Sequence, residues 1–146
     1  FWNSEQLDEM ALTPCWHSHQ FVVLPDEFGN QILNLKIINR SLDCVFGFSF
    51  AIQQYAAYQM AMAKLLGMRP GSLSCDLTHI HIYENQVEYA SELIQRKFYP
   101  PNATLKINKE LNTLDDLINL QYEDFSIHNL KVNREKFKAT KPNMAV

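Results

Sequence analysis

The sequence predicts an α+β fold in which a mostly antiparallel sheet packs against one long buried helix. Residues 31–38 alternate apolar and polar side chains with the period of two that is typical of a strand. Residues 47–66 are instead apolar on almost every side, which indicates a central helix. The 146 residues contain no repeat, linker or low-complexity tract. We therefore expect residues 1–146 to form a single domain.

A β-hairpin is expected ahead of the long helix. The apolar run Gln20–Leu24 and the alternating run Gln31–Ile38 flank Asp26-Glu27-Phe28-Gly29-Asn30, a segment with turn chemistry. In the second run, Leu33, Leu35 and Ile37 point one way. Residues 5–12 are expected to hold a short helical turn, which Pro14 ends.

Further short elements are expected after the long helix, which Gly67 and Pro70 should end. They are a strand over 73–83, a helix over 84–96, a short strand over 103–107, a helical turn or two over 114–118 and a last strand over 122–127. The polar tail from Lys131 is expected to be irregular.

Composition and charge exclude several classes of protein. There are 13 Lys and Arg residues against 16 Asp and Glu, so the formal net charge is −3 and no nucleic-acid partner is expected. With 47% hydrophobic and 20% charged residues, the chain is not of the disordered class. No apolar run approaches the ~18 residues that a membrane span requires, so no membrane partner is expected either.

The cysteines indicate a reducing compartment. Cys15, Cys44 and Cys75 are odd in number and widely spaced, which is not typical of a disulfide framework. We therefore expect a cytoplasmic protein. The pairs His17/His19 and His79/His81 could each share a strand face, but no complete ligand set has metal spacing, so no metal site is expected.

Two local groups could carry chemistry. Cys15 could be a nucleophile, although a lone cysteine is more often an inert, small hydrophobe. Arg40-Ser41-x-Asp43 sets a guanidinium beside a hydroxyl, a pair that can hold a phosphate, and the following helix could add its N-terminal dipole. The commoner reading of such a pattern is a solvated turn with a salt bridge.

Several longer motifs follow one another through the chain. They are Phe1-Trp2-Asn3 with Leu7-Asp8-Glu9-Met10-Ala11-Leu12, Pro14-Cys15 with Gln20-Phe21, Arg40-Ser41-x-Asp43-x-x-x-Gly47 with Phe50-x-Ile52 and Tyr55-Ala56, His81-Ile82-Tyr83-x-Asn85, Tyr122-Glu123-Asp124-Phe125-x-Ile127 and Met144-Ala145-Val146. In this order and spacing they resemble the C-terminal part of the thymidylate synthase family. The resemblance begins in the middle of that family's domain, so we expect the N-terminal part to be absent.

The resemblance implies a reaction. In the family, a cysteine thiolate adds to C6 of a pyrimidine deoxynucleoside monophosphate, which makes C5 nucleophilic. C5 then attacks the one-carbon unit of 5,10-methylenetetrahydrofolate, the folate co-substrate. Hydride from the folate gives a methyl group, whereas water gives a hydroxymethyl group. The resemblance also implies a homodimer, because family members complete the phosphate site with arginines from the neighbouring subunit.

The same resemblance implies the site residues. Cys15 would be the nucleophile, and Arg40 would favour its thiolate by charge. The nucleotide would be bound by Arg40, Ser41, Asp43, Ala51, His81 and Tyr83, with His81 and Tyr83 on the sugar hydroxyl. The folate would be bound by Asp43, Gly47 and Val146, whose terminal carboxylate would help to close the site.

Four positions depart from the family pattern. Trp16 replaces a histidine, Asn39 a glutamine, Ala51 an asparagine and Gln86 a histidine. Ala51 matters most, because an asparagine there can pair with uracil and an aspartate with cytosine, whereas a methyl group can do neither. Methylation and hydroxymethylation, and uracil and cytosine, therefore stay open. A non-catalytic homologue or fragment that acts by binding or assembly is the alternative.

Overall fold

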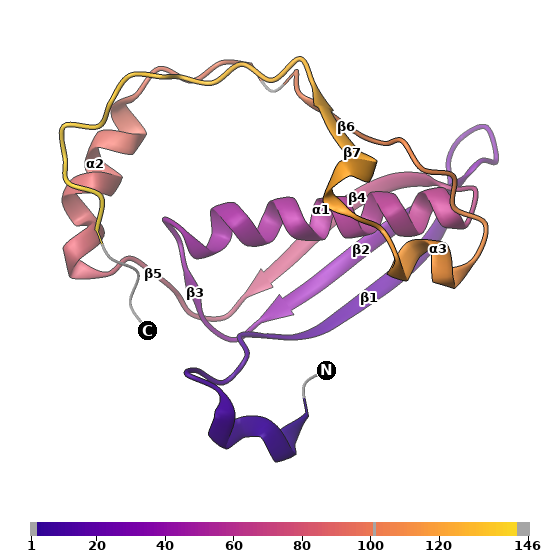
Figure 1. Cartoon of the computed structure of the whole chain (residues 1–146), viewed down its shortest axis with the longest axis horizontal. Helices are drawn as coiled ribbons and strands as arrows, with labels where there is room; N and C mark the ends of the chain where they lie inside the picture. The colour runs from indigo at the N-terminus through magenta and orange to yellow at the C-terminus, as the bar shows by residue number, and fades with distance from the viewer. Residues whose placement is uncertain (1–2, 101, 143–146) are drawn as a thin grey trace.

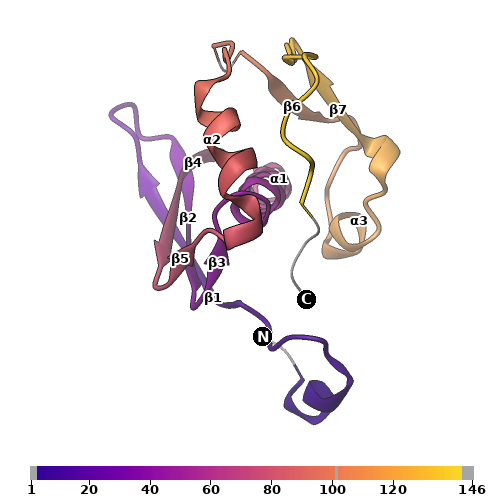
Figure 2. The same cartoon turned by 90° about the vertical axis from the view of Figure 1, so that its left-hand side faces the viewer.

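A three-stranded sheet with one helix across it forms the centre of the protein. The computed structural model describes residues 3–100 and 102–142. The sheet has the order β1-β2-β4, formed by Trp16–Pro25, Gln31–Asn39 and Arg69–Leu77. Helix α1 (Gly47–Leu65) lies along one face of this sheet, and Figure 2 shows that the ribbon leaves the opposite face uncovered. The predicted α+β class is confirmed.

The remaining elements are short. They are 3-10 helices at Ser4–Glu9, Glu84–Gln86 and Tyr122–Asp124, the paired strands β3 (Leu42–Asp43) and β5 (Ile80–His81), the paired strands β6 (Thr104–Ile107) and β7 (Phe125–His128), and helices α2 (Val87–Gln95) and α3 (Leu114–Ile118). Figure 1 shows α2 beyond one end of α1, and β6, β7 and α3 toward its other end.

The predicted hairpin is confirmed, and a carboxylate organises its turn. Strands β1 and β2 pair antiparallel from Trp16↔Asn39 to Pro25↔Gln31. One oxygen of Asp26 accepts hydrogen bonds from the amides of Phe28 and Asn30, at 2.9 and 2.8 Å. Gly29 has a φ of 81°, a left-handed conformation that a side chain would strain. The Asn30 side chain, followed by backbone bonds and Arg69, keeps the pKa of Asp26 below its usual 3.8.

Strand β2 is the middle of the core. Leu33, Leu35 and Ile37 are at most 1% exposed and point toward α1, as the period-two pattern predicted. From α1 the buried Gln59 reaches back to the sheet, and its amide nitrogen donates to the carbonyls of Leu33 (2.8 Å) and Ser72 (3.0 Å). This glutamine therefore joins the helix to two strands at once.

The predicted mostly antiparallel sheet is wrong in one respect, because β2 and β4 run parallel. Neighbouring strands joined by a tight turn are antiparallel, whereas parallel neighbours need a long crossover. Here α1 is the crossover: it carries the chain back so that Ile32 pairs with Arg69 and Asn39 with Leu77. The main sheet is therefore mixed.

Three element predictions need smaller corrections. Helix α1 is only partly buried, because Ala51, Gln59, Ala61 and Ala63 are buried whereas Phe50 is 61% exposed. The strand expected over 73–83 begins earlier, at Arg69, and is interrupted after Leu77, so β4 and β5 are separate strands. The strand expected over 122–127 starts only at Phe125, after a 3-10 turn.

No helix in the described part of the chain is both long and apolar enough to cross a membrane. The irregular tail expected from Lys131 is observed over residues 131–142, where it returns alongside α2 (Figure 1).

Candidate functional site

The start of β1 and the end of β2 place Cys15 beside Arg40. The backbone amide of Arg40 donates to the carbonyl of Cys15 at 3.0 Å, which extends the β1–β2 pairing by one bond. The guanidinium of Arg40 donates from Nε to the carbonyl of Pro14 (3.2 Å) and from Nη2 to that of Thr13 (2.6 Å). Arg40 therefore holds the backbone immediately before the half-exposed Cys15.

This arrangement leaves Arg40 with binding capacity. A guanidinium has five N–H donors in a fixed fork. Two of them point at Thr13 and Pro14, so three remain, and the side chain is exposed. An anion can therefore bind to a guanidinium that is already held in place by the backbone immediately before Cys15.

Asn39 lies on the buried side of this junction. It is 0% exposed, and its Oδ1 accepts from the amide of Ser41 at 2.7 Å. Its Nδ2 is buried with no hydrogen-bond partner among the described residues. The position where the family has a glutamine therefore shapes the turn that presents Arg40 and Ser41.

Both carboxylate oxygens of Asp43 accept hydrogen bonds at the turn that leads into α1. Its Oδ1 accepts from the amide of Val45 at 2.9 Å, and its Oδ2 accepts from Nε2 of Gln86 at 3.1 Å. Gln86 is fully buried. A Cβ on Gly47 would lie 3.3 Å from the Cβ of Asp43, so a side chain there would press on this turn. Gly47 therefore serves the close approach of the helix to Asp43.

His81 and Tyr83 lie together, and the backbone of His81 pairs with that of Asp43. The short β3–β5 ladder pairs Asp43 with His81, and the amide of Cys44 donates to the carbonyl of His81 at 2.8 Å. The rings of His81 and Tyr83 meet edge to face with centroids 4.9 Å apart. Nδ1 of His81 is buried and has no partner within the described residues, so the ring has an unused polar atom.

Trp16 packs against the long helix. Its ring centroid lies 4.9 Å from that of Tyr55, and burial, followed by the neighbouring Tyr58, raises the pKa of the Tyr55 phenol above 10.0. Ala51 lies one helical turn after Gly47 and is 7% exposed. Trp16 and Ala51, two of the four positions that depart from the family pattern, therefore pack against α1 and lie on it, respectively.

A cavity of about 700 Å³ adjoins the N-terminal half of α1. Phe46 and Phe50 from the helix region and Tyr89 and Leu93 from α2 give it apolar walls, and the tail contributes Lys141. An aromatic box with one cation at its edge suits a flat heteroaromatic ligand that also carries a negative charge.

The contacts gather most of the predicted residues into two adjoining groups. One consists of Cys15 and Arg40. The other consists of Asp43, Gly47, His81 and Tyr83, and Ser41 lies between the groups in the chain. Val146 lies outside the described residues.

Sequence reasoning missed two features of this region. Gln86 was noted only as a departure from the family pattern, although it bonds Asp43. The aromatic cavity was also missed, because it joins α1, α2 and the tail, and no spacing in the sequence indicates that these three meet. The apolar pattern of α2 predicted a helix but did not indicate which segments it contacts.

Comparisons with known proteins show the family to which this chain belongs. The family model described as thymidylate synthase matches residues 1–145. A probable thymidylate synthase from Escherichia phage T5 is 35% identical over 127 residues, which are 87% of this chain and 43% of that protein. The structure of thermostable thymidylate synthase A from Bacillus subtilis matches with a TM-score of 0.75 and 27% identity, over 95% of this chain and 47% of that one. The chain thus spans slightly less than half the length of these relatives, and it belongs to the thymidylate synthase family.

Proposed function

We propose that this chain carries the nucleophile and much of the nucleotide site of an enzyme that transfers a one-carbon unit from methylenetetrahydrofolate to C5 of a pyrimidine deoxynucleoside monophosphate. Residues 1–146 would form the C-terminal part of that catalytic domain. The observation that carries the proposal is the contact between Arg40 and the backbone before Cys15, because it ties an anion-binding side chain to the segment that carries the thiol.

The phosphate is the part of the substrate that Arg40 and Ser41 would bind. The free N–H groups of Arg40 and the hydroxyl of Ser41 would bind it, and the rigid guanidinium would lose little freedom on binding. The nucleophile itself would be the thiol of Cys15, on the backbone that follows the two carbonyls held by Arg40.

Cys15 would then bond to C6 of the pyrimidine, and C5 would become the nucleophile. His81 and Tyr83 would orient the sugar through its hydroxyl, with the unpaired Nδ1 of His81 as one available polar atom. Asp43 would act mainly by holding the start of α1 in place, since both of its oxygens already accept hydrogen bonds. C5 would lose its proton as the folate amine leaves, and the thiolate of Cys15 would leave C6 when hydride adds to the exocyclic methylene.

The cavity beside α1 suits the folate. Phe46, Phe50 and Tyr89 can pack against its rings, and Lys141 at the rim can pair with its carboxylates. The cavity adjoins the turn that Asp43 and Gly47 form, so a folate there would lie next to the nucleotide. An apolar wall also keeps water from the reacting carbon, which favours hydride transfer over hydration.

Methylation is the outcome that we propose, because the relatives from phage T5 and Bacillus subtilis both bear the name thymidylate synthase. The test is to incubate the full-length protein with methylenetetrahydrofolate and either dUMP or dCMP, and to weigh the products. A gain of CH2 supports methylation, and a gain of CH2O shows hydroxymethylation. If nucleotide binds but no product forms, a non-catalytic binding protein is the correct description.

The role of Cys15 has its own test. Cys15→Ser should abolish turnover while nucleotide binding largely survives, because the phosphate contacts are unchanged. Cys75→Ser, in β4, is the matched control and should keep turnover. Full activity of the Cys15 variant would rule out covalent catalysis through this thiol.

A homodimer through the open face of the sheet is also proposed. Because Leu33, Leu35 and Ile37 point toward α1, the alternate positions point away from it. The apolar ones among them and their β1 partners are Val22, Leu24, Ile32 and Ile38, and they stand around the Lys36–Asp76 ion pair (2.7 Å). An uncovered apolar face of this kind is typical of an isologous interface.

A further inference from the structure

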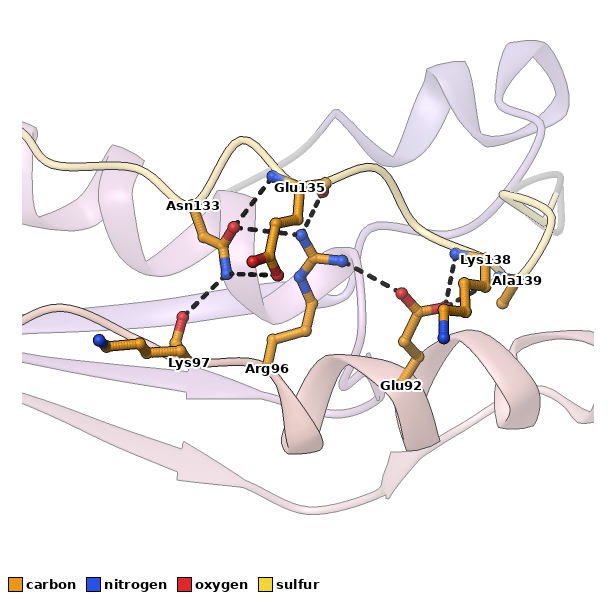
Figure 3. A network of polar contacts seen from close by, with 7 residues as sticks. All are labelled: Glu92, Arg96, Lys97, Asn133, Glu135, Lys138 and Ala139. Atoms are coloured by element: carbon orange, nitrogen blue, oxygen red, sulfur yellow. Dashed lines mark hydrogen bonds and ion pairs between the residues drawn. The ribbon is translucent and has the colours of Figure 1, made fainter.

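The tail is attached to α2 by polar contacts that use few side chains. Residues 133–139 return from the far end of the molecule and lie beside α2, as Figure 3 shows from close by. Ala139, in this stretch, is only 7% exposed. The contacts come from Glu92 on α2 and from Arg96, the residue that follows the helix, and these two side chains also pair with each other at 3.1 Å.

Glu92 holds the tail by its backbone. One carboxylate oxygen, Oε2, accepts hydrogen bonds from the amides of Lys138 and Ala139, both at 2.8 Å. The other, Oε1, accepts from Nη1 of Arg96. These bonds, that of Ala139 foremost, keep the pKa of Glu92 below its usual 4.5, although burial opposes them. The carboxylate is therefore charged at neutral pH, and its bonds are of the strong, charge-assisted kind.

Arg96 holds a part of the tail that precedes the one held by Glu92. Its Nη2 donates to the carbonyl of Glu135 and to Oδ1 of Asn133 (3.5 Å). Its guanidinium carbon also lies 4.1 Å from the ring centroid of Phe137. Arg96 is only 11% exposed, so these contacts are screened far less than those of a surface ion pair.

The clamp leads directly to the cavity. Phe137, under Arg96, stacks on Tyr89 with centroids 4.2 Å apart, and Tyr89 lies 5.6 Å from Phe46. Both Tyr89 and Phe46 line the cavity, and so do Lys141 and Pro142, the residues that follow the clamped stretch. Holding residues 133–139 on α2 thus fixes where the tail forms the cavity wall.

We propose that Glu92 and Arg96 are positioning residues, a tail clamp that holds Lys141 and Pro142 as one wall of the folate cavity. This inference rests on the proposed function, because that function places the folate there. The clamp's contacts all lie on α2 and the tail, away from Cys15 and Arg40. Loosening the clamp should therefore weaken the binding of the folate and leave the binding of the nucleotide unchanged.

The first experiment tests the clamp without any reaction. Hydrogen exchange of the full-length protein is compared for wild type, Glu92→Ala, Glu92→Gln and the control Glu88→Ala. Glu88 is an exposed residue one turn earlier on α2. Glu92→Ala should speed exchange in peptides covering residues 136–142 about tenfold, because the amides of Lys138 and Ala139 lose their acceptor. Glu92→Gln keeps an acceptor oxygen and should fall between; wild-type protection in both Glu92 variants would overturn the clamp.

The second experiment links the clamp to the folate. In Glu92→Gln and Arg96→Lys, the KM for methylenetetrahydrofolate should rise roughly three- to tenfold, while the KM for the nucleotide and the values for Glu88→Ala stay at wild-type level. Equal changes in both KM values would overturn the positioning role. If wild-type protein shows no turnover, the proposed function fails, and the exchange data still decide whether the clamp exists.

Discussion

Gln59 offers a sharp test of how the helix is attached to the sheet. Its amide nitrogen is buried and donates to the carbonyl of Leu33 in β2 and to that of Ser72 in β4. Ser72 lies where the β2–β4 register shifts, so the side chain supplies a donor at a point where the ladder is irregular. We expect Gln59→Leu, which keeps the volume but removes the donor, to destabilise the protein.

The magnitude follows from two lost bonds. A buried acceptor that loses its partner costs about 1–3 kcal/mol, and the added apolar burial of leucine offsets part of the loss. We therefore expect Gln59→Leu to lower the free energy of unfolding by about 2–4 kcal/mol, which corresponds to a drop in Tm of roughly 5–15 °C for a protein of this size. Denaturant unfolding should show a lower midpoint with an unchanged slope.

Gln53→Leu is the matched control. Gln53 is on the same helix, and its amide nitrogen also donates to a carbonyl, that of Ser49 at 2.8 Å, but the pair is exposed. Substitution there should change the free energy of unfolding by no more than about 0.5 kcal/mol. Equal effects at Gln53 and Gln59, or no effect at Gln59, would refute the reasoning.

Three further predictions concern substrate choice, pH and assembly. Ala51→Asn should favour dUMP and Ala51→Asp should favour dCMP, by roughly 1–3 kcal/mol in the kcat/KM ratio for each bond gained; unchanged ratios would mean that another residue reads the base. Because the folded pKa of Asp26 is lowered, its stabilising effect is complete above its usual 3.8 and is lost as the pH falls through the folded value. The stability difference between wild type and Asp26→Asn should therefore be constant near neutral pH and shrink in acid; a constant difference down to strong acid would contradict this. The full-length protein should be dimeric by light scattering and Val22→Lys should weaken the dimer, whereas a wild-type monomer at micromolar concentration would count against the open sheet face as an interface.

Local patterns predicted the elements well where one face of an element is buried and the other is not. The alternation around Leu33, Leu35 and Ile37 predicted β2 and its buried side correctly, and Leu114–Ile118 forms the helical turn expected there. These are local consequences of side-chain direction and helix capping. The side chain of Thr113, for example, caps α3 by accepting from the amide of Asp116.

Pairing and long-range contacts could not be predicted in the same way. Helix α1 ends at Leu65, before Gly67 and Pro70, as predicted, but nothing in the sequence indicated that Pro70 also lies in β4, at the edge of the described sheet, where its missing N–H is tolerated. The parallel direction of β4 depends on where α1 delivers the chain, which periodicity does not encode. The bonds from Glu92 to tail amides involve backbone groups, which carry no residue-specific signal at all. For the site residues, family motifs were needed, since nothing local links Cys15 to Arg40.

The crossover through α1 also bears on how the chain folds as it is synthesised. The β1–β2 hairpin involves only neighbouring residues, so it can form as soon as both strands have left the ribosome. The partners of β2 on its other edge, from Arg69 onward, emerge only after the whole of α1. Until then the apolar side of β2 is exposed to solvent and one of its edges is unpaired, and nascent chains in such a state are prone to aggregate. Early docking of α1, with Gln59 reaching the carbonyl of Leu33 before Ser72 arrives, would shorten that exposed interval during translation.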